Sequence, residues 1–477
     1  MTHFLSPSEM ASITGGRWLD APPADITGIG TDTRDQLNGR MFVALRGERF
    51  DAHEFLGEAA TQGAVGCMVD RPNVVAPIPR LLVNDSLIAL QALATVWRQR
   101  LPKALCIAIT GSAGKTTTRR LVEAACAAFG PTHASPKNFN NHLGVPLTLL
   151  SAPPETQFLV LEIGMNHPGE IEPLARMAAP RVAMVMNAGT AHLEGLGSRE
   201  AIAREKATLA RGLQPAGLLV VQGDHDHLLA AALREPLPAG GKVYGFGVRG
   251  LNAFRMVHRE QRADGAQTIT AFTPSGVIHM DLQLSGAHNA MNALGALAAL
   301  MGLGLSADRV VAAMATVAPA DMRMARSDMG GISIFNDAYN ANPDAMLAAI
   351  ATFAELTGTM QRRVVALGDM LELGEQSDEL HAMVGRHLGR AFAAGPPDVF
   401  LACGKNGTHF VRGLVEVAPH AAFEISADLQ QDSARLAARL RPGDAVLVKG
   451  SRGSGMERLV TAISLLHEQK KGSLIGR

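Results

Sequence analysis

The stretch 108-AITGSAGKTTTRR-120 decides the fold, because it follows an apolar run and precedes a helical pattern. A strand, a glycine-containing turn and a helix N-terminus together form an anion site from backbone N–H groups and the helix dipole. The common phosphate-loop pattern G-x-x-x-x-G-K-[ST] fits poorly, since Ile109 stands where its first glycine should be. Gly111 comes two positions later, so we expect a tighter phosphate loop that bends at Gly111.

Four residues of this loop have an expected function in phosphate binding. Gly111 and Gly114 allow the backbone to approach phosphates closely. Lys115 can reach the outer phosphates, and the Thr116 hydroxyl can bind Mg²⁺. The alternative is a chance G-K-T at a helix start, which the order of strand, turn and helix argues against.

Two further residues are expected at the same edge of the sheet. Glu162 ends the apolar run FLVLEIG, and carboxyl ends of parallel strands face the ligand crevice in folds of this type. Beside a phosphate loop, Glu162 is a candidate Mg²⁺ ligand, although a surface or capping glutamate would have the same sequence. His192 follows the next strand and is as readily a structural histidine as a ligand.

The pattern of elements predicts an α/β protein. From residue 104 onward, short apolar runs alternate with helical patterns, which is typical of a parallel sheet covered by helices. Three strand-like runs within residues 252–286 predict an antiparallel insert, and a second series of strands and helices begins near residue 332. We therefore expect a small α/β domain over residues 1–85, a central phosphate-loop domain over 86–317 and a Rossmann-like domain over 318–477.

The composition excludes several classes of protein. The 477 residues are 47% hydrophobic, which provides apolar surface for several cores. The 44 Lys and Arg residues balance the 44 Asp and Glu residues, which argues against a nucleic-acid partner. The four cysteines form no C-x-x-C pair, so buried reduced thiols are expected rather than zinc or disulfides. With no secretory signal and no membrane-spanning run, we expect a cytoplasmic protein.

Motifs along most of the chain resemble the Mur ligases, which are ATP-dependent enzymes that form amide bonds in peptidoglycan precursors. In chain order these motifs are TGSAGKTTT, NFNNHLGVPLTLL, LEIGMNHPGEI, NAGTAHLEGLGS, SGAHNAMNALGAL, NDAYNANPDAM, LGDMLELGE and VKGSRGSGME. Members of this family carry the shorter G-x-x-G-K-[ST] loop, which residues 111–116 satisfy. DAYNANP, LGDMLELGE and VKGSRG are most similar to the members that add D-alanyl-D-alanine to UDP-N-acetylmuramoyl-tripeptide.

The resemblance implies a site for ATP and Mg²⁺. The catalytic residues would be Lys115, Glu162, His192 and Lys206, and the metal ligands Thr116, Glu162, His192 and, if carbamylated, Lys206. Lys206 matches a lysine that becomes a carbamate in several relatives, whereas its charged helix alone predicts a solvated surface residue. A neutral amine that captures CO₂ becomes an anion able to bind a cation. The implied nucleotide-binding residues are Gly111, Ser112, Ala113, Gly114, Lys115, Thr116, Thr117, His288, Asn289, Asn292, Arg323, Asp337 and Tyr339.

The resemblance also implies two small-molecule substrates. The UDP-sugar-peptide would bind to the N-terminal domain and D-alanyl-D-alanine to the C-terminal domain, where Arg452 offers a bidentate fork for a carboxylate. Met322 departs from the family pattern, since glycine is common before the arginine at position 323. The implied substrate-binding residues are Thr33, Arg34, Phe50, Asp51, His53, Asn138, Asn141, Asn340, Asn342, Lys449, Ser451 and Arg452.

Three other functions fit parts of the pattern. One is a sister ligase that adds a single amino acid, and another is a folylpolyglutamate-type ligase, which shares the two nucleotide-side domains. The domain before the phosphate loop argues against the second. The third is a non-catalytic, nucleotide-dependent binding module, and the presence together of Lys115, Thr116, Glu162 and His192 argues against it. We expect a monomer with small-molecule partners.

Overall fold

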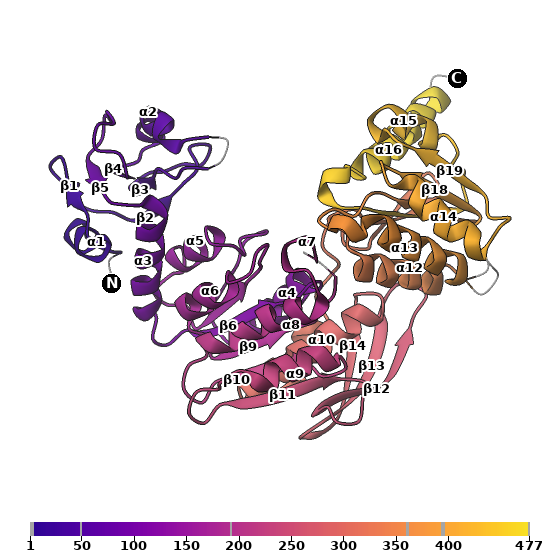
Figure 1. The fold of residues 1–477 in the computed structure, drawn as a ribbon, viewed down its shortest axis with the longest axis horizontal. Helices are drawn as coiled ribbons and strands as arrows, with labels where there is room; N and C mark the ends of the chain where they lie inside the picture. The colour runs from indigo at the N-terminus through magenta and orange to yellow at the C-terminus, as the bar shows by residue number, and fades with distance from the viewer. Residues whose placement is uncertain (1–3, 48–49, 191–192, 359–361, 393–395, 476–477) are drawn as a thin grey trace.

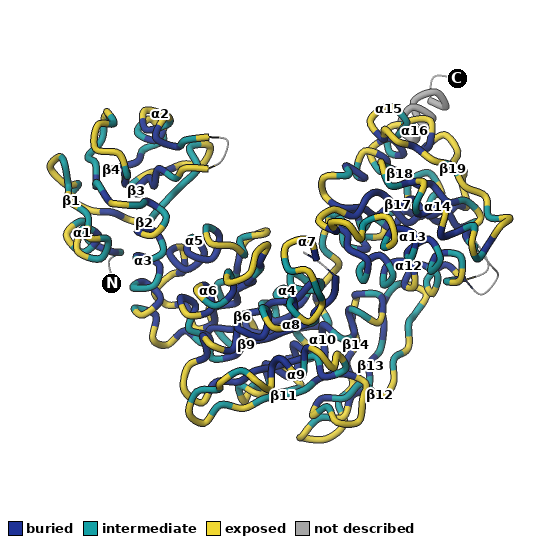
Figure 2. The backbone as a smooth tube through the Cα atoms, viewed as in Figure 1, coloured by how far each residue is buried: buried dark blue, intermediate teal, exposed yellow. Residues whose placement is uncertain are grey.

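The chain folds into three lobes that follow one another along the sequence (Figure 1). The structure is a computed structural model that describes residues 4–47, 50–190, 193–358, 362–392 and 396–475, with side chains up to residue 466. The first and third lobes rise from the same side of the central lobe and stand apart from each other (Figure 1). In Figure 2 the buried segments run through the centre of each lobe, where the strands lie.

The first lobe contains a five-stranded sheet of order β1-β5-β4-β3-β2, which is parallel except for β1. The apolar runs that begin near Met41, Gly66 and Arg80 each form a strand. The strands are β1 (Arg17–Trp18), β2 (Gly28–Gly30), β3 (Arg40–Val43), β4 (Gly66–Val69) and β5 (Arg80–Leu82), and the helices are α1 (Pro7–Thr14), η1 (Ala52–Phe55), α2 (Leu56–Thr61) and α3 (Ser86–Gln99).

The central lobe is built on one nine-stranded sheet of order β14-β13-β12-β11-β10-β9-β6-β8-β7. Alternate residues of its strands point to opposite faces, so that Cys106 and Ala108 join one core and Ile107 and Ile109 the other. Its parallel strands are β6 (Leu105–Thr110), β7 (Thr132–Ala134), β8 (Phe158–Glu162), β9 (Val182–Val185), β10 (Leu218–Gln222) and β11 (Lys242–Gly247).

The expected antiparallel strands are present, and they extend this same sheet. β12 (Phe254–Gln261) pairs parallel with β11, and β13 (Gln267–Thr273) and β14 (Gly276–Leu282) then pair antiparallel. Helices that cover the two faces are α4 (Lys115–Ala127), α5 (Gly144–Leu150), α6 (Ile171–Ala178), α7 (Leu193–Leu196), α8 (Arg199–Ala207) with the 3₁₀ turn η2 (Thr208–Gly212), α9 (Asp226–Arg234), α10 (Ala287–Gly302) and α11 (Ala307–Met314).

The third lobe has a six-stranded sheet of order β15-β16-β20-β17-β18-β19, in which only β15 is antiparallel. Apolar cores cover both of its faces. The strands are β15 (Ala325–Met329), β16 (Ile332–Asp337), β17 (Arg362–Leu367), β18 (Val399–Cys403), β19 (Phe423–Ser426) and β20 (Asp444–Lys449), and the helices are α12 (Pro343–Thr357), η3 (Gly374–Gln376), α13 (Ser377–Arg390), α14 (Gly407–Val417), α15 (Leu429–Ala437), η4 (Arg452–Ser454) and α16 (Glu457–Ile475).

Strand order places the phosphate loop at the centre of the central sheet. β6 lies between β8 and β9, because the chain first continues to one side through β7 and β8 and then returns to build the other side. In open α/β sheets, ligands bind beyond the carboxyl ends of the strands where the strand order reverses. The loop after β6 therefore lies at this crevice, with the ends of β8 and β9 on either side.

No helix in the described part of the chain combines the length and the apolar character that crossing a membrane requires. All four cysteines are buried free thiols, as the sequence predicts. Burial raises the pKa of the Cys67, Cys126 and Cys403 thiols to about 12, so these thiols stay protonated and unreactive at neutral pH.

Candidate active site

The phosphate loop has the geometry of the shorter glycine pattern. Gly114 is the N-cap of α4 with a φ of 81°, a left-handed conformation that glycine adopts readily. A Cβ at Gly114 would also lie 2.4 Å from Asn292 Oδ1, so a side chain is excluded there for lack of space. At Gly111 the restriction is close packing alone, since a Cβ would lie 3.0 Å from the Ala113 carbonyl oxygen.

Asn187, two residues after the end of β9, is hydrogen-bonded to the phosphate loop. Its Oδ1 accepts the Ala113 N–H at 2.9 Å, and its Nδ2 donates to the Ala113 carbonyl at 3.0 Å. The Ser112 hydroxyl accepts the Gly189 N–H at 2.9 Å. The loop is thus fixed through its own peptide groups by the neighbouring strand, which leaves the N-terminus of α4 free to bind an anion.

Glu162 lies beside the loop, as its place at the strand end predicts. In the β6–β8 register Glu162 pairs with Ile109, and its side chain is buried. Thr116 Oγ1 donates to Glu162 Oε2 at 3.3 Å, while Arg119 Nε donates to Glu162 Oε1 at 3.1 Å. The hydroxyl and carboxylate that the sequence suggests as metal ligands are therefore adjacent.

Lys115 extends over the loop and lies in an electropositive environment. Its Nζ donates to the Gly111 carbonyl oxygen at 2.6 Å. Burial lowers the pKa of Lys115, the nearby Glu162 carboxylate opposes that shift, and the Arg323 guanidinium adds to it. An anionic ligand such as a phosphate group would favour the charged form of this amine and restore its pKa.

Lys206 is buried, which corrects the solvated position that its charged helix predicts. Only 1% of the residue is exposed, and the helix that carries it ends at Ala207. Burial is the main reason that the pKa of Lys206 lies well below its usual value, and the positive charge of Lys115 lowers it further. The helix places this residue inward because α8 packs over the sheet and ends in η2 at Thr208.

Of the four predicted magnesium ligands, two lie side by side in the described part of the chain. Thr116 and Glu162 supply two hard oxygen donors side by side, which is the chemistry that Mg²⁺ prefers together with phosphate oxygens. No three His, Cys, Asp or Glu side chains in the described part of the chain gather as a metal centre. His192 lies outside the described residues, and Lys206 presents an amine.

Residues of α10 lie against the loop from the central lobe. Asn292 packs on Gly114, and its Nδ2 donates to Asn289 Oδ1 at 3.1 Å. His288 is half-buried, and its Nδ1 has no partner among the described residues. Burial lowers the pKa of His288 to about 4, so this ring is neutral at pH 7 and can accept a hydrogen bond.

Residues from the third lobe complete the site around the loop. Arg323 Nη2 donates to Thr116 Oγ1 at 3.0 Å, and its guanidinium stacks 4.2 Å from the centroid of the Tyr339 ring. Asn342 is the N-cap of α12 and donates from Nδ2 to the Ser112 carbonyl at 3.4 Å. The N-terminus of α12 therefore docks directly on the phosphate loop.

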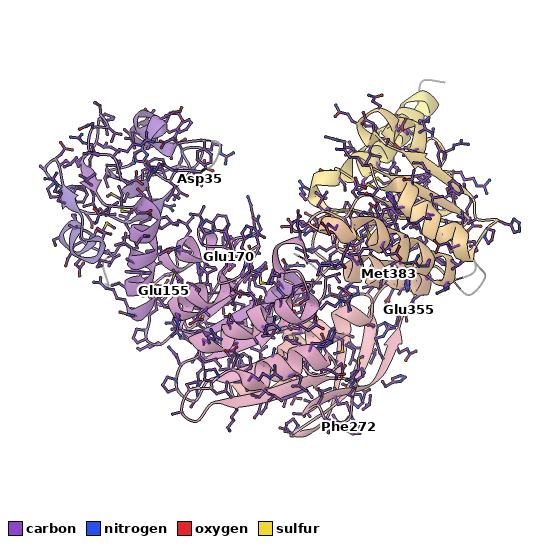
Figure 3. All side chains as sticks on the ribbon, in the orientation of Figure 1. Asp35, Glu155, Glu170, Phe272, Glu355 and Met383 are labelled. Atoms are coloured by element: carbon purple, nitrogen blue, oxygen red, sulfur yellow. The ribbon has the colours of Figure 1, made fainter. Side chains whose placement is uncertain are left out.

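Further hydrogen bonds and an ion pair join the third lobe to the central lobe. Asp344 Oδ2 accepts the N–H and the hydroxyl of Thr190, at 2.8 and 2.9 Å. Farther out, Arg259 of β12 pairs with Glu355 of α12 at 2.6 Å. Figure 3 shows Glu355 at the edge of the third lobe that faces the central lobe.

The other candidate residues of the third lobe form a second group next to Tyr339. Lys449 is buried, and its Nζ donates to Asp337 Oδ2 at 2.7 Å and to the Asn340 carbonyl at 2.9 Å. Ser451 Oγ donates to the Ala341 carbonyl at 3.2 Å. Arg452 is exposed and has no acceptor of this group within hydrogen-bond distance among the described residues. The structure therefore brings Lys449 and Ser451 to the 337–342 loop, with Arg452 at the rim.

The candidate residues of the first lobe lie apart from the phosphate loop. Thr33, Arg34 and Phe50 are exposed or half-exposed, and the neighbouring Asp35 lies on the side of the first lobe that faces the third lobe (Figure 3). His53 is buried, and its Nδ1 lies 2.6 Å from Asp51 Oδ1. His53 is thus a buried residue of η1 and not part of the surface of the first lobe.

The loop between β7 and α5 lies beside the end of β8. Asn138 and Asn141 are exposed there, and Asn141 Oδ1 accepts the Gly144 N–H at 2.9 Å at the start of α5. The Gly164 N–H donates to the Asn140 carbonyl at 2.7 Å. The loop that carries both predicted asparagines is therefore joined to the segment directly after Glu162.

Some residues of this site were not predicted from the sequence. Asn187 binds the phosphate loop, and Arg119 binds the Glu162 carboxylate. Asp344 of the third lobe binds Thr190 of the central lobe. Asn187 stands directly after a strand and at the expected sheet edge, so its position was a usable signal. Arg119 and Asp344 lie on charged helix turns, where a solvated side chain is the usual outcome.

Comparison with known proteins agrees with this architecture. Residues 109–300 match the Mur ligase middle domain, and residues 322–452 match the Mur ligase glutamate ligase domain. The UDP-N-acetylmuramoyl-tripeptide–D-alanyl-D-alanine ligase of Bacillus subtilis is 36% identical over 91% of this chain and 92% of its own length.

Two solved structures have the same three-lobed fold. MurF from Acinetobacter baumannii superposes with a TM-score of 0.87 at 30% identity, over 96% of this chain and 98% of its own. MurF ligase from Thermotoga maritima, solved in complex with ADP, gives 0.79 at 25% identity over 93% and 98% of the two chains. With both family domains matched in order and relatives aligned over nearly its whole length, this chain belongs to the Mur ligase family.

Proposed function

We propose that this protein is an ATP-dependent ligase that joins D-alanyl-D-alanine to UDP-N-acetylmuramoyl-tripeptide. The observation that carries the proposal is the set of residues around the phosphate loop, where Lys115, Thr116 and Glu162 meet Arg323 from the third lobe. Relatives that are 30% or more identical over at least nine tenths of this chain are named for this reaction. The ADP complex of the Thermotoga maritima relative supports ATP as the nucleotide.

The chemistry would proceed in two transfers. An oxygen of the terminal carboxylate of the tripeptide attacks the γ-phosphorus of ATP, so that an acyl phosphate forms and ADP leaves. The amine nitrogen of D-alanyl-D-alanine then attacks the acyl carbon, loses a proton, and expels inorganic phosphate. Both steps gain mostly from positioning and charge neutralisation, as in other phosphoryl transfers.

The residues around the phosphate loop would each act on the phosphates or on the metal ion. Lys115, at the N-terminus of α4, neutralises phosphate oxygens together with the loop N–H groups. Arg323 supplies a second cation from the third lobe, which couples the position of that lobe to the nucleotide. Thr116 and Glu162 would hold Mg²⁺, which would neutralise charge that develops on the phosphates.

Lys206 is proposed to carry a carbamate. Burial lowers the pKa of its amine well below the usual value and so favours the neutral form, and a neutral amine nitrogen can attack CO₂ and release a proton. The resulting carboxylate would replace a buried amine, whose charged form Lys115 disfavours, by an anion that Lys115 attracts.

We expect a carbamate signal when the protein is incubated with ¹³C-bicarbonate and observed by ¹³C NMR. The signal should be absent from Lys206→Ala and present in Lys103→Ala, which removes an exposed lysine. Equal spectra for the protein and for Lys206→Ala would show that Lys206 is not modified.

The substrates would be divided among the three lobes, with limits near residues 85 and 317. The UDP-sugar would bind to the first lobe at Thr33, Arg34 and Phe50, and ATP to the central lobe. D-Alanyl-D-alanine would bind to the third lobe near Lys449 and Ser451. We propose that the protein acts as a cytoplasmic monomer on these small molecules.

A substrate matrix tests the proposal against a sister ligase. The protein is incubated with ATP, Mg²⁺, and UDP-N-acetylmuramoyl-dipeptide or -tripeptide, with either D-alanyl-D-alanine or a single amino acid. We expect phosphate release only with the tripeptide and D-alanyl-D-alanine together. Release with the dipeptide and a single amino acid would assign the sister activity instead.

A further inference from the structure

His381 is a completely buried histidine of α13 that the proposed chemistry does not use. Its Nδ1 lies 2.6 Å from the Ser377 carbonyl oxygen, and its Nε2 lies 3.0 Å from the Met370 backbone nitrogen. A carbonyl oxygen only accepts and a backbone N–H only donates, so Nδ1 carries the hydrogen and Nε2 presents a lone pair. The two contacts therefore require the neutral ring in one tautomer.

The segment that His381 holds is the loop of residues 368–371, directly after β17. The Gly368 N–H donates to the Lys449 carbonyl at 2.8 Å, and the Ser451 N–H donates to the Asp369 carbonyl at 3.0 Å. The Leu371 N–H donates to Ser451 Oγ at 3.0 Å. This loop is thus bonded along its length to the segment that carries Lys449 and Ser451.

We propose that His381 is a positioning residue for the D-alanyl-D-alanine site, because its Nε2 fixes Met370 and thereby aligns loop 368–371 with Lys449 and Ser451. This inference rests on the proposed function, since it assumes that these two residues contact the dipeptide. His381 acts from behind the loop and touches no substrate itself.

Protonation of His381 would break this arrangement. A hydrogen on Nε2 would face the Met370 N–H, so that one buried hydrogen bond is lost and two donors meet. The charged groups around the ring are Asp369 of the loop, Asp378 of α13 and His409 of α14, while the Phe410 ring of α14 packs at 4.8 Å. Dipeptide binding should therefore weaken in acid.

The surroundings of the ring set the pH range. Burial lowers the pKa of His381, the Ser377 carbonyl and Asp369 oppose that shift, and His409 adds to it. Because the folded-state pKa lies below the unfolded value of about 6.5, the neutral form is complete above that pH. The contribution of His381 is lost only as the pH falls through the folded-state pKa, which lies below the unfolded value.

Two variants separate the two ring nitrogens. In His381→Gln the side-chain amide reaches the place of Nε2 and can accept the Met370 N–H without titrating. In His381→Asn the amide reaches only the place of Nδ1, so the bond to Ser377 can form and the bond to Met370 cannot. Steady-state KM and kcat are measured for the dipeptide and for ATP between about pH 5.5 and pH 8.

We expect His381→Asn to raise the KM for D-alanyl-D-alanine about tenfold, with the KM for ATP unchanged and kcat little affected. His381→Gln should keep a KM close to that of the unmodified protein at pH 8. Protonation of the substrate amine in acid raises the dipeptide KM of every variant alike. The dipeptide KM of the unmodified protein, divided by the dipeptide KM of His381→Gln, should therefore rise below about pH 6.5.

A readout without substrate keeps this inference separate from the proposed function. The protection factor of the Met370 amide, which is the intrinsic exchange rate at each pH divided by the measured rate, should be lower in His381→Asn than in His381→Gln, and should fall in acid only in the unmodified protein. Equal exchange in the two variants, or equal losses of kcat and of both KM values, would overturn the positioning role. No turnover of D-alanyl-D-alanine by the unmodified protein would instead refute the proposed function.

Discussion

Replacement of Lys115 by alanine is expected to lower ligation about a hundredfold to a thousandfold while the fold remains intact. Lys115 is the cation at the N-terminus of α4, and in this structure its amine contacts only the Gly111 carbonyl among the described residues. Burial already lowers its pKa, so its removal should not reduce the free energy of unfolding. The loss would therefore appear in catalysis and not in stability.

The measurement compares ADP release that depends on D-alanyl-D-alanine with the urea midpoint of the same preparation. Arg120→Ala is the matched control, because it also removes a cation from α4. The Arg120 guanidinium donates to the Ala318 carbonyl and not to the loop. ADP release at a near-normal rate in Lys115→Ala would contradict the assigned role of the loop.

Replacement of Arg98 by alanine is expected to lower the free energy of unfolding by about 3 to 5 kcal/mol. Arg98 is buried in α3 and donates to the carbonyls of Ala178, Leu101, Ala104 and Ala179, at 2.8, 3.0, 3.2 and 3.2 Å. Its removal leaves these acceptors buried without a donor, at the junction of the first and central lobes.

Urea unfolding followed by circular dichroism measures this loss. Arg100→Ala is the control on the same helix, since Arg100 forms a half-exposed pair with Glu9 that is worth at most about 1 kcal/mol. A midpoint for Arg98→Ala that equals the midpoint for Arg100→Ala would show that water replaces the guanidinium without cost.

The local features of the site could be predicted from the sequence because they depend on neighbours in the chain. The run before residue 110 forms β6, the helical pattern after it forms α4, and Glu162 lies at the end of its strand. Gly111 belongs to the loop as expected, although the left-handed conformation occurs at Gly114.

Contacts between lobes could not be predicted, because they depend on how whole domains pack. The pairing of Asp344 with Thr190 joins positions 154 residues apart, and the contact of Arg323 with Thr116 joins positions 207 apart. The burial of Lys206 is of the same kind, since its charged helix gives no sign of the surface that covers it.

Met322 shows how a departure from the family pattern can leave the backbone unchanged. Its φ is 57°, the left-handed conformation that the more common glycine adopts readily. Its carbonyl accepts the Tyr339 N–H at 3.2 Å, and its sulfur lies 3.3 Å from Arg452 Nη1. The turn before Arg323 therefore keeps the geometry expected for glycine despite the side chain.

Mass detection of the product tests the central claim most directly. The protein is incubated with ATP, Mg²⁺, UDP-N-acetylmuramoyl-tripeptide and D-alanyl-D-alanine. The nucleotide-linked products are then separated, and their masses are measured by mass spectrometry. We predict a UDP-linked pentapeptide that forms in an amount equal to ADP and to phosphate. This product should be absent when D-alanyl-D-alanine is omitted and absent when ATP is omitted. ADP formation with no mass increase of the UDP-linked tripeptide would contradict the account.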